Sequence, residues 1–296
     1  MIISVASGKG GTGKTIIATS LAMSLNGPLQ LLDCDVEEPN AHIFIKPDIT
    51  TAEDVYLPVP EVDETKCDFC GRCQKVCAYN AIAVIFPKDR SDPGKVLVFP
   101  ELCHGCGSCT YFCPKDAIQE TSRKIGIVEK GNKSNIEFIH GKLNIGEAIS
   151  PPVIRAVKKR IDREKTVIID APPGTSCPVI ASLQGTDYCI LVTEPTPFGL
   201  YDLTLAVEVL RKMKIPFGVV VNRSDLGNNK TDEYCERKKI PVLIRIPFSR
   251  EIAAAYSKGI SIVEAFPEYR KLFQALFEDI KKTLKNITVK GAESCD

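Results

Sequence analysis

Eight of the 13 cysteines in this 296-residue chain stand in two runs of identical spacing, C-x2-C-x2-C-x3-C. The runs consist of Cys67, Cys70, Cys73 and Cys77, and of Cys103, Cys106, Cys109 and Cys113. An iron–sulfur cluster needs several thiolates around one small cube, and two-residue spacers in a tight loop supply them while a fourth thiolate comes from further away. The pattern therefore predicts two iron–sulfur clusters with four cysteine ligands each.

Two other uses of these cysteines fit the chain less well. Disulfide frameworks are typical of short secreted proteins, whereas this chain is long and its apolar start lacks the basic stretch and cleavage site of a signal peptide. Zinc would need two tetrahedral sites of four thiolates each. The doubled run, with Pro114 after its last cysteine, favours iron–sulfur clusters.

A phosphate-binding motif, G-x-x-x-x-G-K-[ST], stands near the start of the chain. It follows an apolar run and precedes a helical pattern, so its backbone N–H groups can surround a phosphate at a helix N-terminus. Lys14 supplies positive charge to the β- and γ-phosphates, and Thr15 supplies a hydroxyl to Mg²⁺. The expected nucleotide-binding residues are Gly8, Gly10, Gly11, Thr12, Gly13, Lys14 and Thr15.

Strands and helices that could position these motifs alternate on both sides of the cysteines. Strands are expected at 2–6, 29–32, 166–170, 188–193, 217–221 and 242–246, and helices at 14–25, 151–163, 200–212, 231–239 and 268–285. Short apolar strands between helices predict an α/β fold, with a mostly parallel sheet covered by helices on both faces. A hairpin is expected from 124–129 and 136–143, around Lys130-Gly131-Asn132.

The cysteine-rich region interrupts this alternation. Its two halves each carry a cysteine run followed by an Ala-Ile pair, which indicates an internal repeat. We expect a small α+β domain at 58–121, inserted into a nucleotide-binding domain formed by 1–57 and 122–296. Such a small domain has little hydrophobic core, so bound clusters would supply much of its folding energy.

Lys9 adds a second lysine at the start of the glycine loop, and the chain resembles the MinD/Mrp superfamily of deviant Walker A P-loop ATPases. The resemblance implies that Lys9 reaches the phosphates of a partner subunit. It also implies that Asp33 or Asp35 orients the attacking water, a choice that the sequence leaves open. Asp170 would hold the Mg²⁺ shell, and Gly174 would sense the γ-phosphate. The adenine-binding positions implied by the resemblance are Asn222, Arg223 and Pro247.

The cysteine region resembles the two-cluster bacterial ferredoxins, in which the fourth cysteine of each run serves the other cluster. This implies one [4Fe–4S] cluster on Cys67, Cys70, Cys73 and Cys113, and a second on Cys103, Cys106, Cys109 and Cys77. Ala78 stands where these ferredoxins usually have proline.

The five remaining cysteines are assigned separately. Cys34 and Cys189 are expected to be small buried hydrophobes, while Cys235 and Cys295 are expected at the surface or in the tail. Cys177 follows Asp170 by seven residues, and a role as a ligand of an iron–sulfur cluster shared between two subunits is an alternative for it. Such a cluster would need two cysteines from each subunit, and no clear second one is evident in the sequence.

The resemblances imply an ATP- and Mg²⁺-dependent hydrolase with two [4Fe–4S] clusters that couples a nucleotide-driven dimer to electron transfer. The alternatives are an iron–sulfur cluster carrier or maturation factor, and a redox-responsive positioning protein. The dimer could be formed with a second copy or a paralogue, and a redox protein or metalloenzyme is the expected partner. The net charge of +1 predicts neither a nucleic-acid nor a membrane partner, and the expected location is cytoplasmic.

Overall fold

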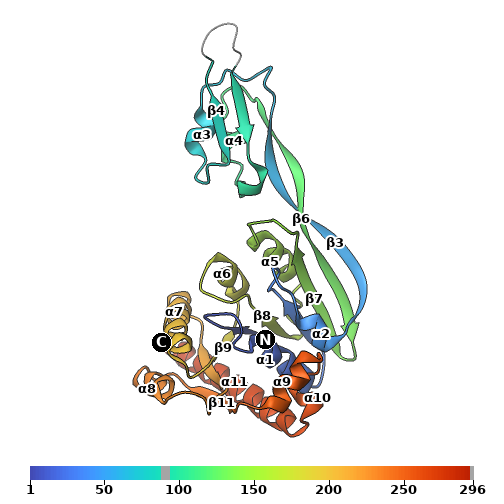
Figure 1. The fold of residues 1–296 in the computed structure, drawn as a ribbon, viewed down its shortest axis with the longest axis vertical. Coiled ribbons are helices and arrows are strands. Elements are labelled where there is room, and N and C mark those ends of the chain that lie inside the picture. The colour runs from blue at the N-terminus through green and yellow to red at the C-terminus, as the bar shows by residue number, and fades with distance from the viewer. Residues whose placement is uncertain (88–93, 294–296) are drawn as a thin grey trace. The chain divides into compact units, whose positions relative to one another are not determined.

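The computed structural model describes residues 1–87 and 94–293, and side chains up to residue 287, so Cys295 lies outside the described residues. The chain forms two compact units (Figure 1). The first comprises Met1–Glu53, Val128–Lys142 and Val153–Asp296, and the second comprises Asp54–Ile127 and Leu143–Pro152. The predicted insert, 58–121, falls within the longer segment of the second unit.

A nine-stranded sheet has the strand order β11-β10-β9-β1-β8-β2-β7-β6-β3. Its strands are β1 (Ile2–Ala6), β2 (Leu29–Asp33), β3 (Asp48–Val62), β6 (Ile118–Lys133), β7 (Ile136–Leu143), β8 (Thr166–Asp170), β9 (Tyr188–Thr193), β10 (Phe217–Asn222) and β11 (Val242–Ile246). Each pair of neighbouring strands from β11 to β7 is parallel, as the alternating pattern predicts. In such a sheet the loops after the strands meet at one edge.

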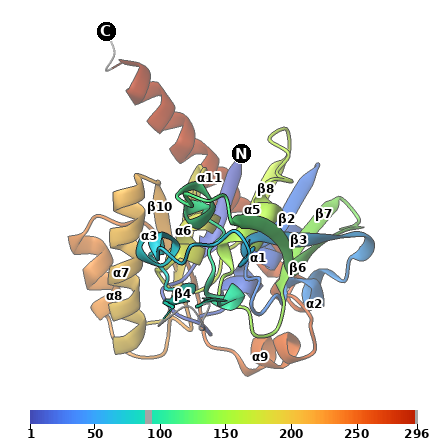
Figure 2. The same cartoon turned by 90° about the horizontal axis from the view of Figure 1, so that it is seen from above.

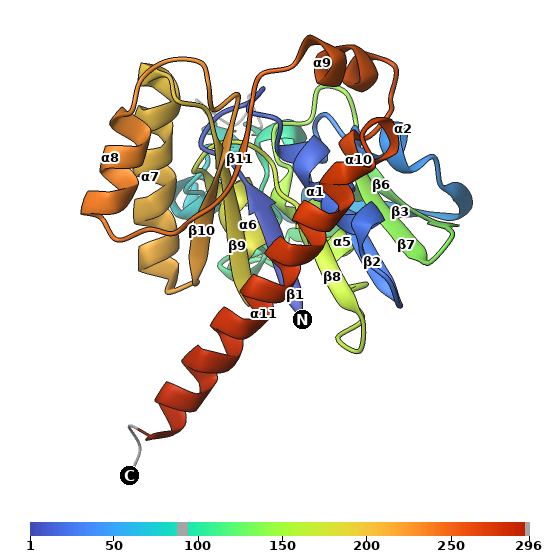
Figure 3. The same cartoon turned by 90° about the horizontal axis from the view of Figure 1, so that it is seen from below.

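The helices of the first unit cover both faces of the sheet, as predicted. They are α1 (Lys14–Ser24), α2 (Ala41–Ile45), α5 (Pro151–Lys158), α6 (Cys177–Leu183), α7 (Pro197–Met213), α8 (Lys230–Arg237), α9 (Arg250–Ser257), α10 (Ile262–Ala265) and α11 (Glu268–Glu293). Alternate residues of β9 face opposite layers, so Ile190 packs with α1 and α11 while Leu191 packs with α7 and α8. Figure 2 shows α7 and α8 side by side, and Figure 3 shows α11 crossing α1.

Two sequence-based predictions about this unit are wrong. The strand β6 continues through Gly131 to Lys133, so the hairpin turns at Ser134 and Asn135. A Cβ at residue 131 would lie 2.5 Å from the carbonyl oxygen of Asp48 on β3, which explains a glycine inside the strand. Cys235 is buried rather than exposed, because α8 turns it toward the sheet together with Tyr234.

The second unit repeats its backbone conformation in its two halves. A short helix carries the third cysteine of each run, α3 (Arg72–Val76) and α4 (Ser108–Tyr111), and β4 (Ile82–Ile85) pairs antiparallel with β5 (Lys95–Val98). Left-handed backbone angles occur at matching positions of the two halves, namely Phe69, Gly71 and Asn80, and Gly105, Gly107 and Asp116. The repeated spacing in the sequence is therefore a repeated local structure.

Candidate functional site

The glycine loop joins β1 to α1, and its last glycine is fixed by a close neighbour. Gly13 has a φ of 90°, and a Cβ there would lie 2.4 Å from Nδ2 of Asn222. That amide instead donates to the carbonyl oxygen of Thr12 over 2.8 Å, while Oδ1 of Asn222 accepts from the backbone N–H of Arg223 over 3.0 Å. The residue predicted to hold adenine therefore contacts the phosphate loop.

A buried group of ionisable side chains lies at the start of α1. Lys14 donates to Oδ1 of Asp170 over 2.6 Å, and its Nζ lies 3.6 Å from Oδ2 of Asp35. The hydroxyl of Thr15 donates to Oδ2 of Asp170 over 2.6 Å. Burial lowers the pKa of Lys14, but Asp170 and Asp35 oppose it more strongly and leave that pKa raised. The lysine, threonine and aspartate predicted to hold phosphate and Mg²⁺ are thus in mutual contact.

Asp33 and Asp35 occupy different environments, a distinction that the sequence left open. The carboxylate of Asp33 is fully buried and accepts backbone N–H groups from Asp35, Asn40 and Ala41 at 3.0–3.1 Å. Burial raises its pKa, and the Asp170 carboxylate raises it further. The Asp35 carboxylate faces Lys14, and burial raises its pKa to about 6. Asp33 therefore holds the loop after β2, whereas the Asp35 carboxylate faces Lys14.

Three neighbouring groups bear on phosphate binding. Lys9 makes no ion pair within the described part of the chain, and its carbonyl accepts from the hydroxyl of Ser7 over 2.7 Å. The N–H of Gly174 donates to the carbonyl of Ser7 over 2.9 Å, so in this conformation it is engaged by the chain. The buried hydroxyl of Thr12 has no hydrogen-bond partner among the described residues. An unpartnered buried donor in this loop fits an oxyanion ligand.

One pocket is lined by all three predicted adenine-binding positions. It is lined by Gly11, Gly13, Ile16, Asn222, Arg223, Pro247, Phe248, Ser249, Ile252, Ala253 and Tyr256. The sequence prediction missed the residues from Phe248 onward, although aromatic side chains after a strand end at the ligand-binding edge are a usable signal. The hydroxyl of Ser249 caps α9 by accepting from the N–H groups of Glu251 and Ile252.

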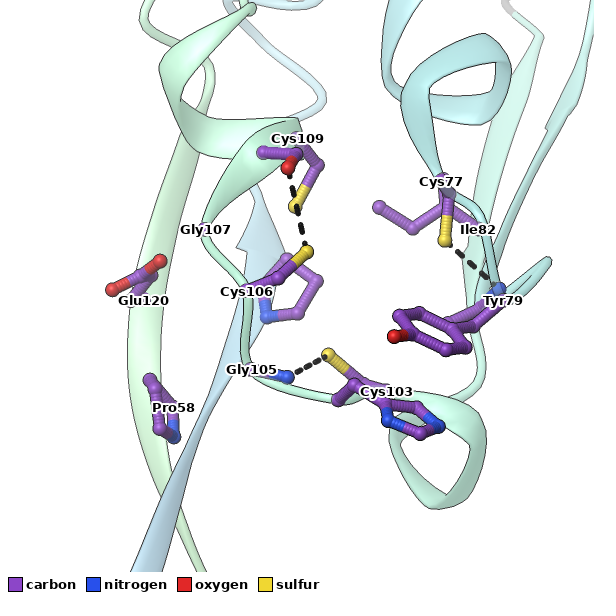
Figure 4. Close-up of a pocket in the computed structure, with 14 residues that line it drawn as sticks. Pro58, Cys77, Tyr79, Ile82, Cys103, Gly105, Cys106, Gly107, Cys109 and Glu120 are labelled. Carbon is purple, nitrogen blue, oxygen red and sulfur yellow. Dashed lines mark hydrogen bonds between the residues drawn. The ribbon is translucent and has the colours of Figure 1, made fainter. Parts of the chain in front are cut away.

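The cysteines of the second unit line two separate cavities, in the pairing that the resemblance implied. One cavity is lined by Cys67, Cys70, Cys73 and Cys113, and we call it cavity A. The other, cavity B, is lined by Cys103, Cys106, Cys109 and Cys77 (Figure 4). Within the described ranges, no three His, Cys, Asp or Glu side chains are placed as ligands of a single metal ion.

Backbone N–H groups point at matching sulfur atoms in the two halves. Sγ of Cys67 and Sγ of Cys103 accept from the residue two positions later, both at 3.4 Å. Sγ of Cys77 and Sγ of Cys113 accept from the residue four positions later, at 3.2 and 3.3 Å. Such N–H···S bonds suit thiolates that carry negative charge, so the donor set fits an iron–sulfur cluster.

The other described cysteines are not among the residues that line these cavities. Cys34 and Cys189 are fully buried, as predicted, and burial raises the pKa of each thiol beyond its ordinary range. Cys177 is exposed at the first position of α6. No described cysteine besides those of the two runs lines cavity A or cavity B.

The parallel sheet, the glycine loop after β1 and the contact between Lys14 and Asp170 define a P-loop nucleotide-binding protein. Residues 3–262 match the CobQ/CobB/MinD/ParA nucleotide binding domain. The chain belongs to that family.

Similar proteins extend over nearly the whole chain. An uncharacterized protein of Methanocaldococcus jannaschii is 31% identical over 278 residues, which cover 92% of this chain and 93% of the relative. A protein of Pyrococcus horikoshii named iron-sulfur cluster carrier protein is 24% identical and covers 98% of this chain and 89% of its own length.

Solved structures share the fold at low sequence identity. The cell division ATPase MinD of Pyrococcus furiosus superposes with a TM-score of 0.56 at 21% identity, covering 95% of this chain and 98% of MinD. MinD of Pyrococcus horikoshii, complexed with Mg-ADP, gives a TM-score of 0.55 at 19% identity, covering 95% of this chain and 96% of its own. Across the residues that the structure describes, no helix has the length and apolarity needed to span a membrane.

Proposed function

We propose that this chain is an ATP-hydrolysing iron–sulfur protein in which a nucleotide-driven dimer controls electron transfer through two [4Fe–4S] clusters. The observation that carries the proposal is the pairing of cysteines in the second unit. Three cysteines of one run and the fourth of the other line each cavity, which is the ligand arrangement of two-cluster ferredoxins. Bound clusters would supply one-electron chemistry at low potential.

The chain's own residues support the hydrolysis half of the proposal. Lys14 would neutralise charge on the β- and γ-phosphates, and Thr15 and Asp170, which contact it and each other, would hold Mg²⁺. Asp35 would orient the attacking water, and the approach of its carboxylate to Lys14 supports this role. Lys9 would add positive charge from the partner subunit when two chains close around nucleotide, whether that partner is a second copy or a paralogue.

The first experiment measures iron content together with ATP hydrolysis. Protein prepared without oxygen should hold about eight irons and eight sulfides, the content of two [4Fe–4S] clusters. A variant with Cys67, Cys70, Cys73 and Cys113 all replaced by serine should keep about half of the iron. Replacing all four cysteines of the first run instead should disturb both clusters, because that run contributes ligands to both cavities. A chain without iron would refute the proposed function.

A second candidate function is iron–sulfur cluster delivery, which the name of the Pyrococcus horikoshii relative favours. The two functions predict opposite fates for the iron. The clusters are reduced anaerobically, and an apo-protein acceptor and ATP are then added. Electron transfer predicts that iron stays with the chain through repeated reduction and oxidation, whereas delivery predicts stoichiometric loss of iron to the acceptor.

A further inference from the structure

The two cavities have the same cysteine geometry, but the side chains at equivalent positions around them differ in charge. The residue after the first cysteine of each run is Asp68 at cavity A and His104 at cavity B. Two residues after the fourth cysteine stand Lys115 at cavity A and Tyr79 at cavity B. Because the backbone repeats, these side chains approach corresponding sides of the two cavities.

Two more equivalent positions show the same contrast. Arg72 follows the second cysteine of its run by two residues at cavity A, and Ser108 takes that position at cavity B. Val84, seven residues after the last cysteine of the first run, lines cavity A. Glu120, seven residues after the last cysteine of the second run, lines cavity B. Four positions thus place two cations and one carboxylate around cavity A, but a single carboxylate and no lysine or arginine around cavity B.

Cavity B is also lined by a pair of stacked aromatic rings. The Tyr79 and His104 rings have centroids 3.5 Å apart and planes inclined by 8°. Tyr79 comes from the first half of the repeat and His104 from the second, so the stack joins the halves at the cavity that both residues line. Figure 4 shows Tyr79 among the lining residues. Cavity A has one aromatic lining residue, Phe69, at the position of Gly105, but no ring stands at the positions of Tyr79 and His104.

These differences act on a charge that changes during reduction. A reduced cluster carries one more negative charge than the oxidised one, so nearby cations stabilise the reduced form and nearby carboxylates oppose it. An aromatic cover replaces water that would otherwise solvate the added charge. Arg123 is a cation whose charge reaches Cys103 at cavity B. It does not offset the Glu120 carboxylate there, because its guanidinium forms a bidentate ion pair with Glu147.

We infer that the two clusters of the proposed function are inequivalent. Arg72 and Lys115 raise the reduction potential at cavity A, while Tyr79, His104 and Glu120 keep the potential lower at cavity B. The cluster at cavity B is then the stronger reductant of the pair. This inference rests on the proposed function, since it requires a cluster in each cavity.

The test is a redox titration of the whole chain followed by electron paramagnetic resonance, with iron content measured in every sample. The wild-type protein should show two one-electron steps at distinct potentials. R72S and K115Y make cavity A resemble cavity B, so each should lower the higher step and leave the lower one in place. Y79K makes cavity B resemble cavity A and should raise the lower step.

Lys75 provides the matched control. It lies on α3 with Arg72 but lines neither cavity, so K75S should leave both steps close to their wild-type positions. Coincident steps in wild-type protein that holds about eight irons would overturn the inference while leaving the proposed function standing. A shift of the lower step in R72S would overturn it as well. Absence of iron from the wild-type chain would instead refute the proposed function.

Discussion

The side-chain amide of Asn222, at the end of β10, donates to the backbone carbonyl of Thr12, in the loop after β1, over 2.8 Å. The strand β9 lies between β10 and β1, so this bond links two edges of the nucleotide pocket across an intervening strand. The Oδ1 atom of the same amide accepts from the backbone N–H of Arg223. Asn222 therefore holds the glycine loop in this conformation, while its amide keeps a second N–H and a second lone pair, and its role in adenine binding stays a prediction.

The first prediction concerns N222A. Loss of one hydrogen bond to the loop should weaken nucleotide binding by about twofold to thirteenfold, from about 0.5–1.5 kcal/mol per bond. Because the bond supports the phosphate loop, the affinities for ATP and GTP should fall by the same factor. Titration calorimetry with both nucleotides measures this. Selective loss of ATP affinity would show that Asn222 reads the base.

The second prediction separates the two lysines of the glycine loop. K14A leaves Asp33, Asp35 and Asp170 without their buried cation, so unfolding should require about 3–5 kcal/mol less. It should also abolish ATP hydrolysis while the iron content stays at its wild-type level, because the cysteine cavities belong to the other unit. Chemical denaturation, phosphate release and iron analysis measure these three effects.

K9A is the matched control for that variant. Lys9 forms no ion pair with any of the described residues, so its removal should leave the free energy of unfolding nearly unchanged. Hydrolysis should still fall if Lys9 acts on the partner's phosphates, and mixing K9A with a hydrolysis-dead K14A chain should restore part of it. A loss of stability as large as in K14A would contradict the separate roles of the two lysines.

The glycine loop, the cysteine runs and the parallel strands could be predicted because each depends on short spacings in the sequence. Other features depend on contacts between distant segments. The contact of Asn222 with Thr12 joins residues 210 positions apart, and the Tyr79–His104 stack joins the two halves of the repeat. The roles of Asp33 and Asp35 could not be separated from the sequence, because they are decided by which backbone N–H groups the fold brings to Asp33.

The third prediction is a pH dependence of stability that involves Asp35. Folding raises its pKa from the ordinary value of 3.8 to about 6, so the native state holds the proton more tightly than the unfolded state. Wild-type stability should therefore fall as pH rises from about 4 to about 6. D35N lacks this carboxylate, so it should be more stable than wild type at pH 8, by up to about 3 kcal/mol, and no more stable at pH 4.

Denaturation curves at several pH values measure this difference. E37Q removes an exposed carboxylate that contributes to the raised pKa of Asp35, so its curve should lie between those of wild type and D35N. D35N should also lose hydrolysis despite its greater stability, because the carboxylate that faces Lys14 is gone. A D35N chain that hydrolyses ATP at the wild-type rate would exclude Asp35 as the residue that orients water and return the choice to Asp33.

The fourth prediction concerns the C-terminal end of α6, the helix that follows Gly174. Lys158, the last residue of α5, donates from Nζ to the carbonyl oxygens of Ala181, Ser182 and Gln184 at 3.0, 2.6 and 2.5 Å. Carbonyl groups at the C-terminal end of a helix lack intrahelical partners, and a cation there also interacts favourably with the negative end of the helix dipole. K158M should therefore destabilise α6 locally, by about 1–3 kcal/mol.

Hydrogen exchange followed by mass spectrometry measures that local effect. Exchange should become faster in peptides that contain residues 177–184 and remain unchanged in those from β10 and β11. Lys159 is the exposed neighbour of Lys158, and its side chain makes no hydrogen bond or ion pair with the described residues. K159M should therefore leave exchange at its wild-type rate. Equal protection of α6 in K158M and K159M would show that Lys158 does not hold the helix. Faster exchange in K158M, together with altered ATP hydrolysis, would show that the position of α6 affects the nucleotide site through the segment that carries Gly174.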